Sequence, residues 1–335
     1  MLARRAVSLP FAFLAFPVLL VLSPVLIVLA VLADLVLAPR RFPSTRLFLA
    51  VTGYAFWTMS VQLAIFVVWV WSGFGLRNWA PSTQRRWHGL TRFWLRKNIS
   101  WLGPTLGYRV DVTDLHHLHS GPLLVFARHE SIFDALLPPR LVTESPDMVV
   151  RVLMMRELRN EPNLDMVAHR APHHFVDRAA DDPDAEIAAV GRLASDLPDD
   201  TAVVIFPEGR LFRPEVRARV IERLDASDHG AAARARELRH LLPPRAGGAL
   251  ALIDTAPEGT DVAFVGHIGF EQLTDARTVW RSVPLKHSIE VVVVRRPAAE
   301  IPIEDGDRMA WIHEQWKALD DWIDARRASR DSAPA

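Results

Sequence analysis

Two residues, His129 and Asp134, form the first candidate for chemistry. The segment at 128–134 reads Arg-His-Glu-Ser-Ile-Phe-Asp, so the carboxylate follows the imidazole by five positions. On a continuous helix such positions lie about 140° apart, but a strand–turn–helix junction can fold the side chains together. A carboxylate that holds an imidazole fixes its tautomer and stabilises its protonated form. The spacing therefore predicts a general base, His129, oriented by Asp134.

Downstream residues predict a site for a phosphate-sized anion. Glu208 and Gly209 end the sequence Phe-Pro-Glu-Gly, and Arg210 and Arg213 follow within four residues. Basic side chains and free backbone N–H groups at such a turn bind phosphate oxygens. Arg178, which follows a short apolar pair, offers a further guanidinium fork for phosphate.

These motifs also have purely structural interpretations. Ser131 and Asp134 fit a helix capping box, with Ser131 as N-cap and Asp134 three positions later. This interpretation is compatible with the first, because a carboxylate fixed at a helix start is well placed to accept an imidazole N–H. The Pro-Glu-Gly sequence at 207–209 is also an ordinary strand-ending turn. Arg178, taken singly, fits a surface salt bridge.

Several other chemistries are excluded or disfavoured. The chain has no cysteine, which excludes disulfides, thiolate catalysis and thiolate metal sites. Phe133 stands where a zinc-binding HExxH sequence needs its second histidine, and there is no G-x-S-x-G nucleophile sequence. We therefore expect no metal ion, with a metal-dependent membrane hydrolase using His116, His117 and His119 as a less favoured alternative.

The elements that must position these residues alternate between short apolar runs and helical stretches from about Tyr108 onward. Strands are predicted at Tyr108–Val112, Leu123–Ala127, Met148–Met154, Ala202–Phe206, Val262–Ile268 and Ile289–Val294. Helices are predicted at Ser131–Leu141, Ala185–Leu197, Glu215–Asp225, Ala231–Leu242 and Asp307–Arg327. Such alternation predicts an α/β fold, in which helices cover both faces of a layered, mostly buried mixed sheet. His129 then follows a strand end, the usual location of functional groups in open α/β sheets.

The N-terminal part predicts a membrane anchor. Ala6–Ala38 contains one charge, Asp34, and Leu47–Leu76 contains none, and each run exceeds the roughly 20 residues that span a bilayer. Three prolines, among them Pro24, predict that the first run is kinked or forms a short hairpin. A cleaved signal peptide is the alternative, but its apolar region normally covers about 7–15 residues. We expect a retained anchor.

The charge distribution favours anionic lipid over nucleic acid as a partner. Residues 1–110 carry twelve Lys and Arg against one acidic residue, whereas the remainder carries 27 basic and 38 acidic residues. Arginines flank both apolar runs, so the positive-inside rule places every flank in the cytoplasm. Two full spans would contradict this rule, and re-entrant or monotopic insertion resolves the conflict. We expect the cytoplasmic membrane, with the catalytic domain facing the cytoplasm.

Residues 81–106 predict a basic, Trp-rich interfacial helix. Trp87, Leu90, Trp94 and Trp101 recur at helical spacing, and five basic residues surround them. The alternative is an ordinary amphipathic helix that packs on the globular part. With this helix, the predicted organisation is an anchor at 1–80, the interfacial helix, a catalytic domain at 107–328 and a disordered tail at 329–335.

Taken in order, three sequences resemble the motifs of the glycerolipid acyltransferases of the lysophosphatidic acid acyltransferase superfamily. They are His129-x4-Asp134, Phe175-Val-Asp-Arg178 and Phe206-Pro-Glu-Gly209. The stretch at 241–248 and the Trp-rich C-terminal part resemble the branch that contains lysophospholipid acyltransferases. The resemblance covers roughly residues 107–327 and implies a glycerol-3-phosphate acyltransferase-like fold.

The resemblance also implies an activity. A fatty acyl group would move from acyl-CoA or acyl-carrier protein, used as a substrate and not as a bound cofactor, to the hydroxyl of a lysophospholipid such as lysophosphatidic acid. His129 and Asp134 would be catalytic, and Glu208 and Gly209 would lie in the acceptor site. A catalytically inactive membrane scaffold of the same fold is the alternative.

Two residues depart from the family pattern. Arg128 stands where the family usually has Asn before the catalytic histidine. Leu211 stands where the family usually has the Arg that contacts phosphate. Arg210 or Arg213 would then take over this contact from a neighbouring position, together with Arg178.

Overall fold

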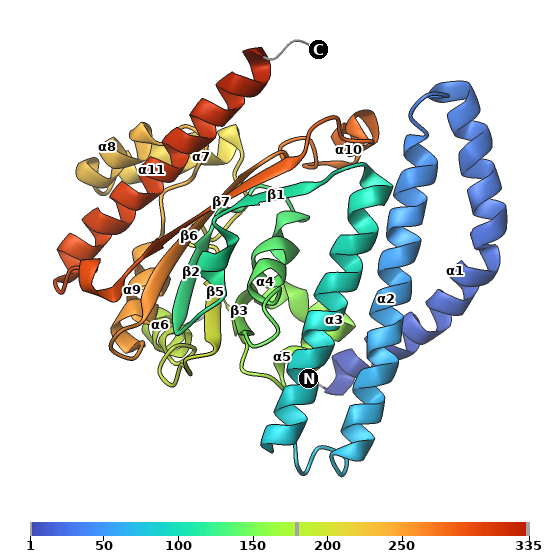
Figure 1. Cartoon of the computed structure of the whole chain (residues 1–335), viewed down its shortest axis with the longest axis horizontal. Helices are drawn as coiled ribbons and strands as arrows, with labels where there is room; N and C mark the ends of the chain where they lie inside the picture. The colour runs from blue at the N-terminus through green and yellow to red at the C-terminus, as the bar shows by residue number, and fades with distance from the viewer. Residues whose placement is uncertain (1, 178–180, 333–335) are drawn as a thin grey trace. The chain divides into compact units, whose positions relative to one another are not determined.

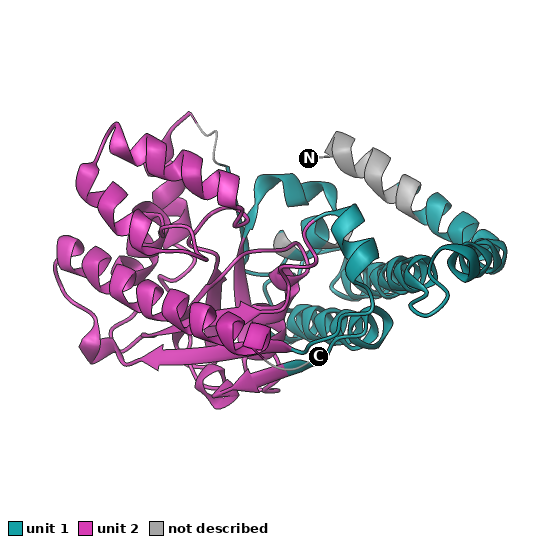
Figure 2. Ribbon diagram, turned by 90° about the horizontal axis from the view of Figure 1, so that it is seen from above, with its two compact units in different colours: residues 1–110, 154–177, 275–288 teal, residues 111–153, 178–274, 289–335 magenta. Residues whose placement is uncertain are grey.

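The chain forms two compact units, drawn in different colours in Figure 2. The computed structural model describes residues 2–177 and 181–332, so the predicted phosphate ligand Arg178 lies outside the described residues. The first unit comprises residues 1–110, 154–177 and 275–288, and the second comprises residues 111–153, 178–274 and 289–335. The division is therefore not a single point near residue 107, because two later segments belong with the N-terminal helices.

The first unit is mainly helical (Figure 1). Its elements are α1 (Leu2–Leu37), α2 (Pro43–Trp71), α3 (Pro81–Leu106), η3 (Arg156–Asn160), α5 (Pro162–Ala168), β4 (His174–Val176) and α10 (Ala276–Ser282). The short elements α5, β4 and α10 have no counterpart among the predicted ones.

The remaining elements belong to the second unit, except for single strand ends that cross the division. They are β1 (Val110–Thr113), η1 (Leu115–Leu118), β2 (Leu123–Ala127), η2 (Asp134–Leu136), α4 (Leu137–Val142), β3 (Val149–Met155), α6 (Pro183–Gly191), β5 (Thr201–Ile205), α7 (Pro214–Asp225), α8 (His229–Glu237), α9 (Ala246–Thr255), β6 (Asp261–Ile268), β7 (Ile289–Arg296), η4 (Ala298–Glu300) and α11 (Asp305–Ser332). The predicted α/β class is confirmed.

Seven strands form one mixed sheet in the order β1-β7-β6-β2-β5-β3-β4. Strand β2 pairs in parallel with β5 and β6, β3 pairs in parallel with β5, and β7 runs antiparallel to β6. Every residue of β2 and of β5 is buried, which explains their continuous apolar sequences, Leu-Leu-Val-Phe-Ala and Thr-Ala-Val-Val-Ile. The carboxyl ends of β2, β5 and β6 therefore lie at the same edge of the sheet.

Two predicted helices have different bounds in the structure because carboxylates accept hydrogen bonds from backbone N–H groups there. The predicted helix Ser131–Leu141 is divided into η2 and α4, since Asp134 accepts hydrogen bonds from the loop before it. The predicted helix Ala231–Leu242 ends at Glu237, and the next residues leave the helix. There, Arg239 and His240 donate their N–H groups to Asp320 at 2.9 and 2.7 Å.

Helices α1 and α2 form a hairpin whose turn is closed by the single acidic residue of the N-terminal part. Asp34 is fully buried, and its carboxylate accepts the N–H groups of Ser44 and Thr45 at 3.0 and 2.7 Å. These N–H groups belong to the first turn of α2, which lacks intrahelical acceptors. Phe13–Leu37 and Pro43–Trp71 are long and apolar enough to cross a membrane. The first run is one helix that contains its prolines, and not a hairpin around Pro24.

Helix α3 turns its tryptophan face toward α2, which changes the interfacial interpretation. Trp87 and Trp94 are buried, and their indole N–H groups donate to Asn78 at 3.0 Å and to Thr58 at 3.2 Å. Trp101 donates to the carbonyl of Leu49. This face therefore packs on α2, the predicted anchor, and not on the globular part as in the alternative, and contact of the basic residues of α3 with lipid stays a prediction. The tail also differs, because α11 continues to Ser332.

Candidate active site

His129 and Asp134 bond to each other in the segment that follows strand β2 in the sequence. The Nδ1 atom of His129 lies 2.6 Å from Oδ1 of Asp134, and the loop at 128–133 brings the two residues together as predicted. Asp134 can only accept, so Nδ1 carries the hydrogen and the lone pair of Nε2 is left for another proton. The His129 side chain is 16% exposed and that of Asp134 is fully buried. This arrangement is that of a general base with its orienting carboxylate.

The second oxygen of Asp134 fixes the carboxylate. Oδ2 accepts the N–H groups of Glu130 at 2.6 Å and Ser131 at 2.7 Å, the half of the predicted capping box in which the carboxylate reaches back. Nε2 of His267 lies 3.4 Å from the same oxygen. Burial opposes ionisation, but the hydrogen bonds from His129 and His267 hold the pKa of Asp134 far below its ordinary value. Asp134 therefore stays ionised and holds His129 in one tautomer.

The segment after β5 holds the backbone of His129 on both sides. Glu208 accepts the N–H of His129 on Oε1 and the N–H of Leu242 on Oε2, both at 3.0 Å. The N–H of Phe212 donates to the carbonyl of His129 at 2.8 Å. The ring of Phe206 stacks on the imidazole with a centroid distance of 4.4 Å. The Phe-Pro-Glu-Gly motif thus positions His129.

Glu208 is a buried carboxyl group with an altered proton affinity. Burial raises the pKa of Glu208 to about 8, against the opposing effect of its two backbone donors and of Arg128. Both of its oxygens are engaged with backbone N–H groups. The geometry therefore gives Glu208 a positioning role, whereas the resemblance placed it in the acceptor site.

Arg128, the departure from the family's Asn, is part of the protein interior. It is fully buried, and its guanidinium donates to the carbonyls of His267 and His240 and pairs with Glu130 at 2.9 Å. Glu130 also pairs with Arg327 of α11 at 3.0 Å. These contacts tie the loop at 128–133 to β6 and to α11, so Arg128 links three parts of the fold at a position where the family usually has the smaller Asn.

Arg213 is held by backbone carbonyls. Its Nη1 donates to Glu130 O and Phe212 O at 2.6 Å, and its Nη2 donates to Thr274 O at 3.2 Å. A guanidinium with these bonds braces the loops around His129 and has few donors left for phosphate. Arg210 and Leu211 are half-buried in the same segment. The phosphate role of Arg210 and Arg213 stays a prediction.

Arg245 lies beside Gly209 and was not among the predicted site residues. Gly209 has a φ of +66°, and a Cβ at this position would lie 3.0 Å from Nε and 3.3 Å from Cζ of Arg245. The N–H of Arg245 donates to the carbonyl of Pro207 at 3.0 Å. Glycine is therefore needed both for the backbone and for the approach of the guanidinium. The stretch at 241–248, noted for its resemblance, was the sequence signal for it.

Backbone N–H groups near Ser131 and Gly209 would be suitable donors for an oxyanion by their place in the chain, but they are engaged elsewhere. Those of Glu130 and Ser131 donate to Asp134, and that of Gly209 donates to the carbonyl of Phe206 at 2.9 Å. None of these three points at a free oxyanion position.

Two of the histidines considered for a metal lie side by side, with the ring centroids of His116 and His117 4.3 Å apart and the rings tilted by 55°. His117 Nδ1 bonds to the carbonyl of Val293 at 3.2 Å. Within the described ranges 2–177 and 181–332, no group of three His, Asp or Glu side chains could hold a metal ion.

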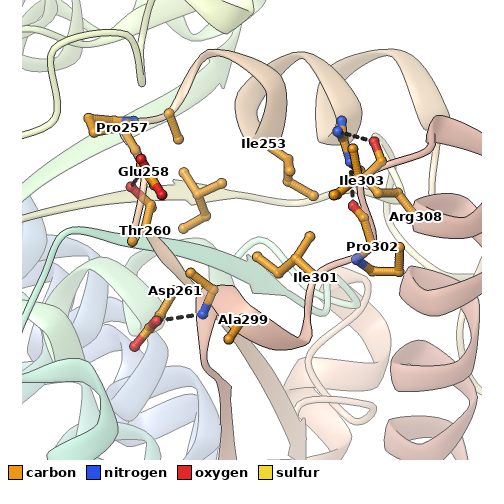
Figure 3. A pocket seen from close by; sticks show the side chains of 14 residues that line it. Ile253, Pro257, Glu258, Thr260, Asp261, Ala299, Ile301, Pro302, Ile303 and Arg308 are labelled. Carbon is orange, nitrogen blue, oxygen red and sulfur yellow. Dashed lines mark hydrogen bonds between the residues drawn. The ribbon is translucent and has the colours of Figure 1, made fainter.

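A separate cleft of about 590 Å³ lies at the opposite edge of the sheet (Figure 3). Leu124, near the start of β2, and Asp261, the first residue of β6, line it, whereas His129 follows the other end of β2. Asp261 accepts from Arg295 at 2.7 Å and from the N–H of Ala298 at 2.8 Å, and Arg308 donates to Pro302 O at 2.8 Å. Asp261 and Arg308 of this cleft thus bind neighbouring residues, and the cleft is distinct from the candidate site.

Comparisons with known proteins give two findings. Residues 109–265 match the model of the Acyltransferase family, which confirms the predicted resemblance. The crystal structure of the 1-acyl-sn-glycerophosphate (LPA) acyltransferase PlsC from Thermotoga maritima is similar to this chain, with 14% sequence identity and a TM-score of 0.48. The match covers 82% of this chain and 95% of that one. No curated protein sequence matches the chain.

Proposed function

We propose, on the premise of the match of residues 109–265 to the Acyltransferase family model, that the protein moves a fatty acyl group from an acyl thioester to the hydroxyl of a lysophospholipid such as lysophosphatidic acid. The donor is acyl-CoA or acyl-carrier protein, used as a substrate. The observation that carries the proposal is the 2.6 Å bond between His129 Nδ1 and the buried carboxylate of Asp134.

The chemistry follows from this bond. Nε2 of His129 takes the proton of the acceptor hydroxyl while the hydroxyl oxygen attacks the thioester carbonyl, and Asp134 stabilises the imidazolium that forms. The tetrahedral intermediate collapses, the C–S bond breaks, and the departing thiolate takes the proton from His129. The absence of cysteine and of a nucleophile elbow supports direct transfer without an acyl-enzyme.

The acceptor's phosphate is bound at the turn after β5 in this proposal. Arg245 and Arg210 are its ligands within the described residues, with Arg178 as a third. The position where the family usually has its phosphate-binding arginine holds Leu211, so these ligands come from other positions. The contact of the Arg245 guanidinium with Gly209, next to the residue that holds the His129 backbone, supports this assignment. Guanidinium groups bind phosphate oxygens in charge-assisted, often bidentate pairs.

The proposal includes membrane attachment, which the apolar surface of the first unit supports. Large apolar side chains of α1 are exposed, among them Leu14 at 71% and Val36 at 82%. At one end of α2, Ser44 bonds to Trp280, and near the other end Asn78 and Gln84 bond to the carbonyl of Arg170. The start of α2 and the chain that follows α2 therefore both bond to later parts of the chain. This favours monotopic or re-entrant insertion into the cytoplasmic face over two full spans.

The test is acyl transfer by membranes that contain the full chain, using labelled acyl-CoA or acyl-carrier protein and lysolipids with and without an exposed phosphate. We expect transfer to the phosphate-bearing lysolipid, and its loss by at least about 100-fold in His129→Ala. His117→Ala, in a histidine remote from Asp134, is the matched control. Wild-type protein without transfer to any acceptor would favour the inactive scaffold.

A further inference from the structure

A second histidine lies behind the catalytic carboxylate, inside the protein. His267, near the end of β6, is fully buried. Its Nε2 lies 3.4 Å from Oδ2 of Asp134 and 3.4 Å from the carbonyl oxygen of Arg128. This carboxylate oxygen is the one that does not contact His129. The sequence shows His267 only as a lone polar residue within an apolar strand.

The surroundings of His267 determine its protonation. Nδ1 is buried without a hydrogen-bond partner among the described residues, and the ring packs edge-on against Phe270 with centroids 5.2 Å apart. An imidazolium would bury a charged Nδ1–H without an acceptor, which is costly. Both neighbours of Nε2 are oxygen acceptors. The neutral ring with hydrogen on Nε2 is therefore the form that fits.

We propose that His267 is a positioning residue that donates its Nε2–H to Asp134 and, through Asp134, lowers the proton affinity of His129. This inference rests on the proposed general-base role of His129. Each donor on a carboxylate weakens its attraction for a further proton donor, so His129 loses its proton more readily. Besides His267 and Asp134 themselves, the charged or titratable groups around them are His129, Arg128 and Glu208.

The experiment compares three substitutions of His267. His267→Leu removes the donor and keeps an apolar side chain, whereas His267→Gln places an amide nitrogen where Nε2 stands. His267→Asn keeps a polar group, but its shorter side chain does not reach Asp134. If the Leu variant does not fold, the Asn variant takes its place.

The first measurement does not depend on acyl transfer. The rate at which diethyl pyrocarbonate modifies His129, followed by mass spectrometry of its peptide across pH, gives the titration midpoint of this residue. We expect the Leu or Asn variant to raise this midpoint by about half to one pH unit, and the Gln variant to stay near wild type. The acid limb of the kcat profile should move in parallel, with a loss of about threefold to tenfold below the midpoint and an unchanged KM for the acceptor.

Two results would overturn the inference. An unchanged His129 midpoint in a folded Leu or Asn variant means that His267 does not act on the dyad. Equal losses in the Gln variant and in the Leu or Asn variant mean that His267 only fills space. A shifted midpoint in a protein that acylates no lysolipid would instead contradict the proposed function and leave the role of His267 intact.

Discussion

Replacing Asp134 with Asn should damage the enzyme more than replacing it with Ala, although Asn is the closer match in shape. Two backbone N–H groups point at Oδ2, from 2.6 and 2.7 Å, and one imidazole nitrogen points at Oδ1. An Asn side chain has one oxygen and one NH2 group to place between these partners. The orientation of the Asn side chain therefore decides whether Nδ1 of His129 faces an oxygen acceptor or an NH2 donor.

The magnitude follows from counting these bonds. Directing the NH2 group at the two backbone N–H groups would leave both unsatisfied, at about 1–3 kcal/mol each. The orientation in which the Asn oxygen faces the two backbone N–H groups should therefore be favoured over the flipped one by about 2–6 kcal/mol. The NH2 group then donates to Nδ1 of His129, the ring hydrogen moves to Nε2, and the base is lost. In an analogous triad the wrong tautomer lowers kcat by about 10⁴-fold.

Asp134→Ala leaves His129 free to adopt either tautomer, and we expect a smaller loss of about 100-fold. The assay is the release of thiol from acyl-CoA at saturating lysophosphatidic acid, with His129→Ala as the floor and near-ultraviolet circular dichroism as the folding control. KM for both substrates should change little. An Asn variant with more than about a tenth of wild-type kcat, or a folded Ala variant slower than the Asn variant, would refute the tautomer argument.

Three further predictions concern Glu208, Arg245 with Arg213, and Asp34. Glu208 keeps its proton in the folded protein up to about pH 8 but releases it near 4.5 when unfolded, so its contribution to the free energy of unfolding falls as pH rises through this window. Glu208→Gln should flatten that fall in urea unfolding between pH 5.5 and 7.5, and an unaltered slope would contradict it. Arg245→Ala should raise KM about tenfold or more for lysophosphatidic acid but not for monoacylglycerol or the thioester, whereas Arg213→Ala should chiefly lower Tm. Equal kinetic effects of the two substitutions would contradict this division. Asp34→Ala should weaken the start of α2 by about 1 kcal/mol and speed tryptic cleavage in the turn at 38–42, and an unchanged cleavage rate would argue against the cap.

The pairing of His129 with Asp134 and the central sheet could be predicted because local patterns determine them. The strand Leu123–Ala127 is buried on both faces, so its apolar run has the observed bounds. The pairing of His129 with Asp134 also needs only six neighbouring residues and one turn. In both cases the deciding interactions lie close in the sequence.

Other features could not be predicted because distant residues determine them. Helix α8 ends early because Asp320 captures the N–H groups of Arg239 and His240. Helix α9 was missed because Gly247 and Gly248 lower its intrinsic helix propensity. Its formation depends on tertiary packing, which local propensity does not report.

The site shows the same limit. Arg213 and Arg245 are equally basic in the sequence, and only the fold gives one three carbonyl partners and the other a place at the glycine turn. The burial of Trp94 likewise depends on helix α2, whose Thr58 and Tyr54 it contacts. The spacing of apolar residues alone could not distinguish packing against a helix from contact with a lipid surface.

The composition of the first unit also has a consequence for the order in which the protein is made. Trp280 donates its indole N–H to Ser44 at 2.9 Å, and these residues are 236 positions apart. At about 5–20 residues per second, the ribosome delivers Trp280 roughly 10–50 s after Ser44. Throughout that interval α10 has not been synthesised, so the apolar side chains of the hairpin of α1 and α2 cannot pack against it. Lipid is thus available to the hairpin before the unit can be completed. A separately expressed catalytic fragment would carry α10 without the helix that it packs against.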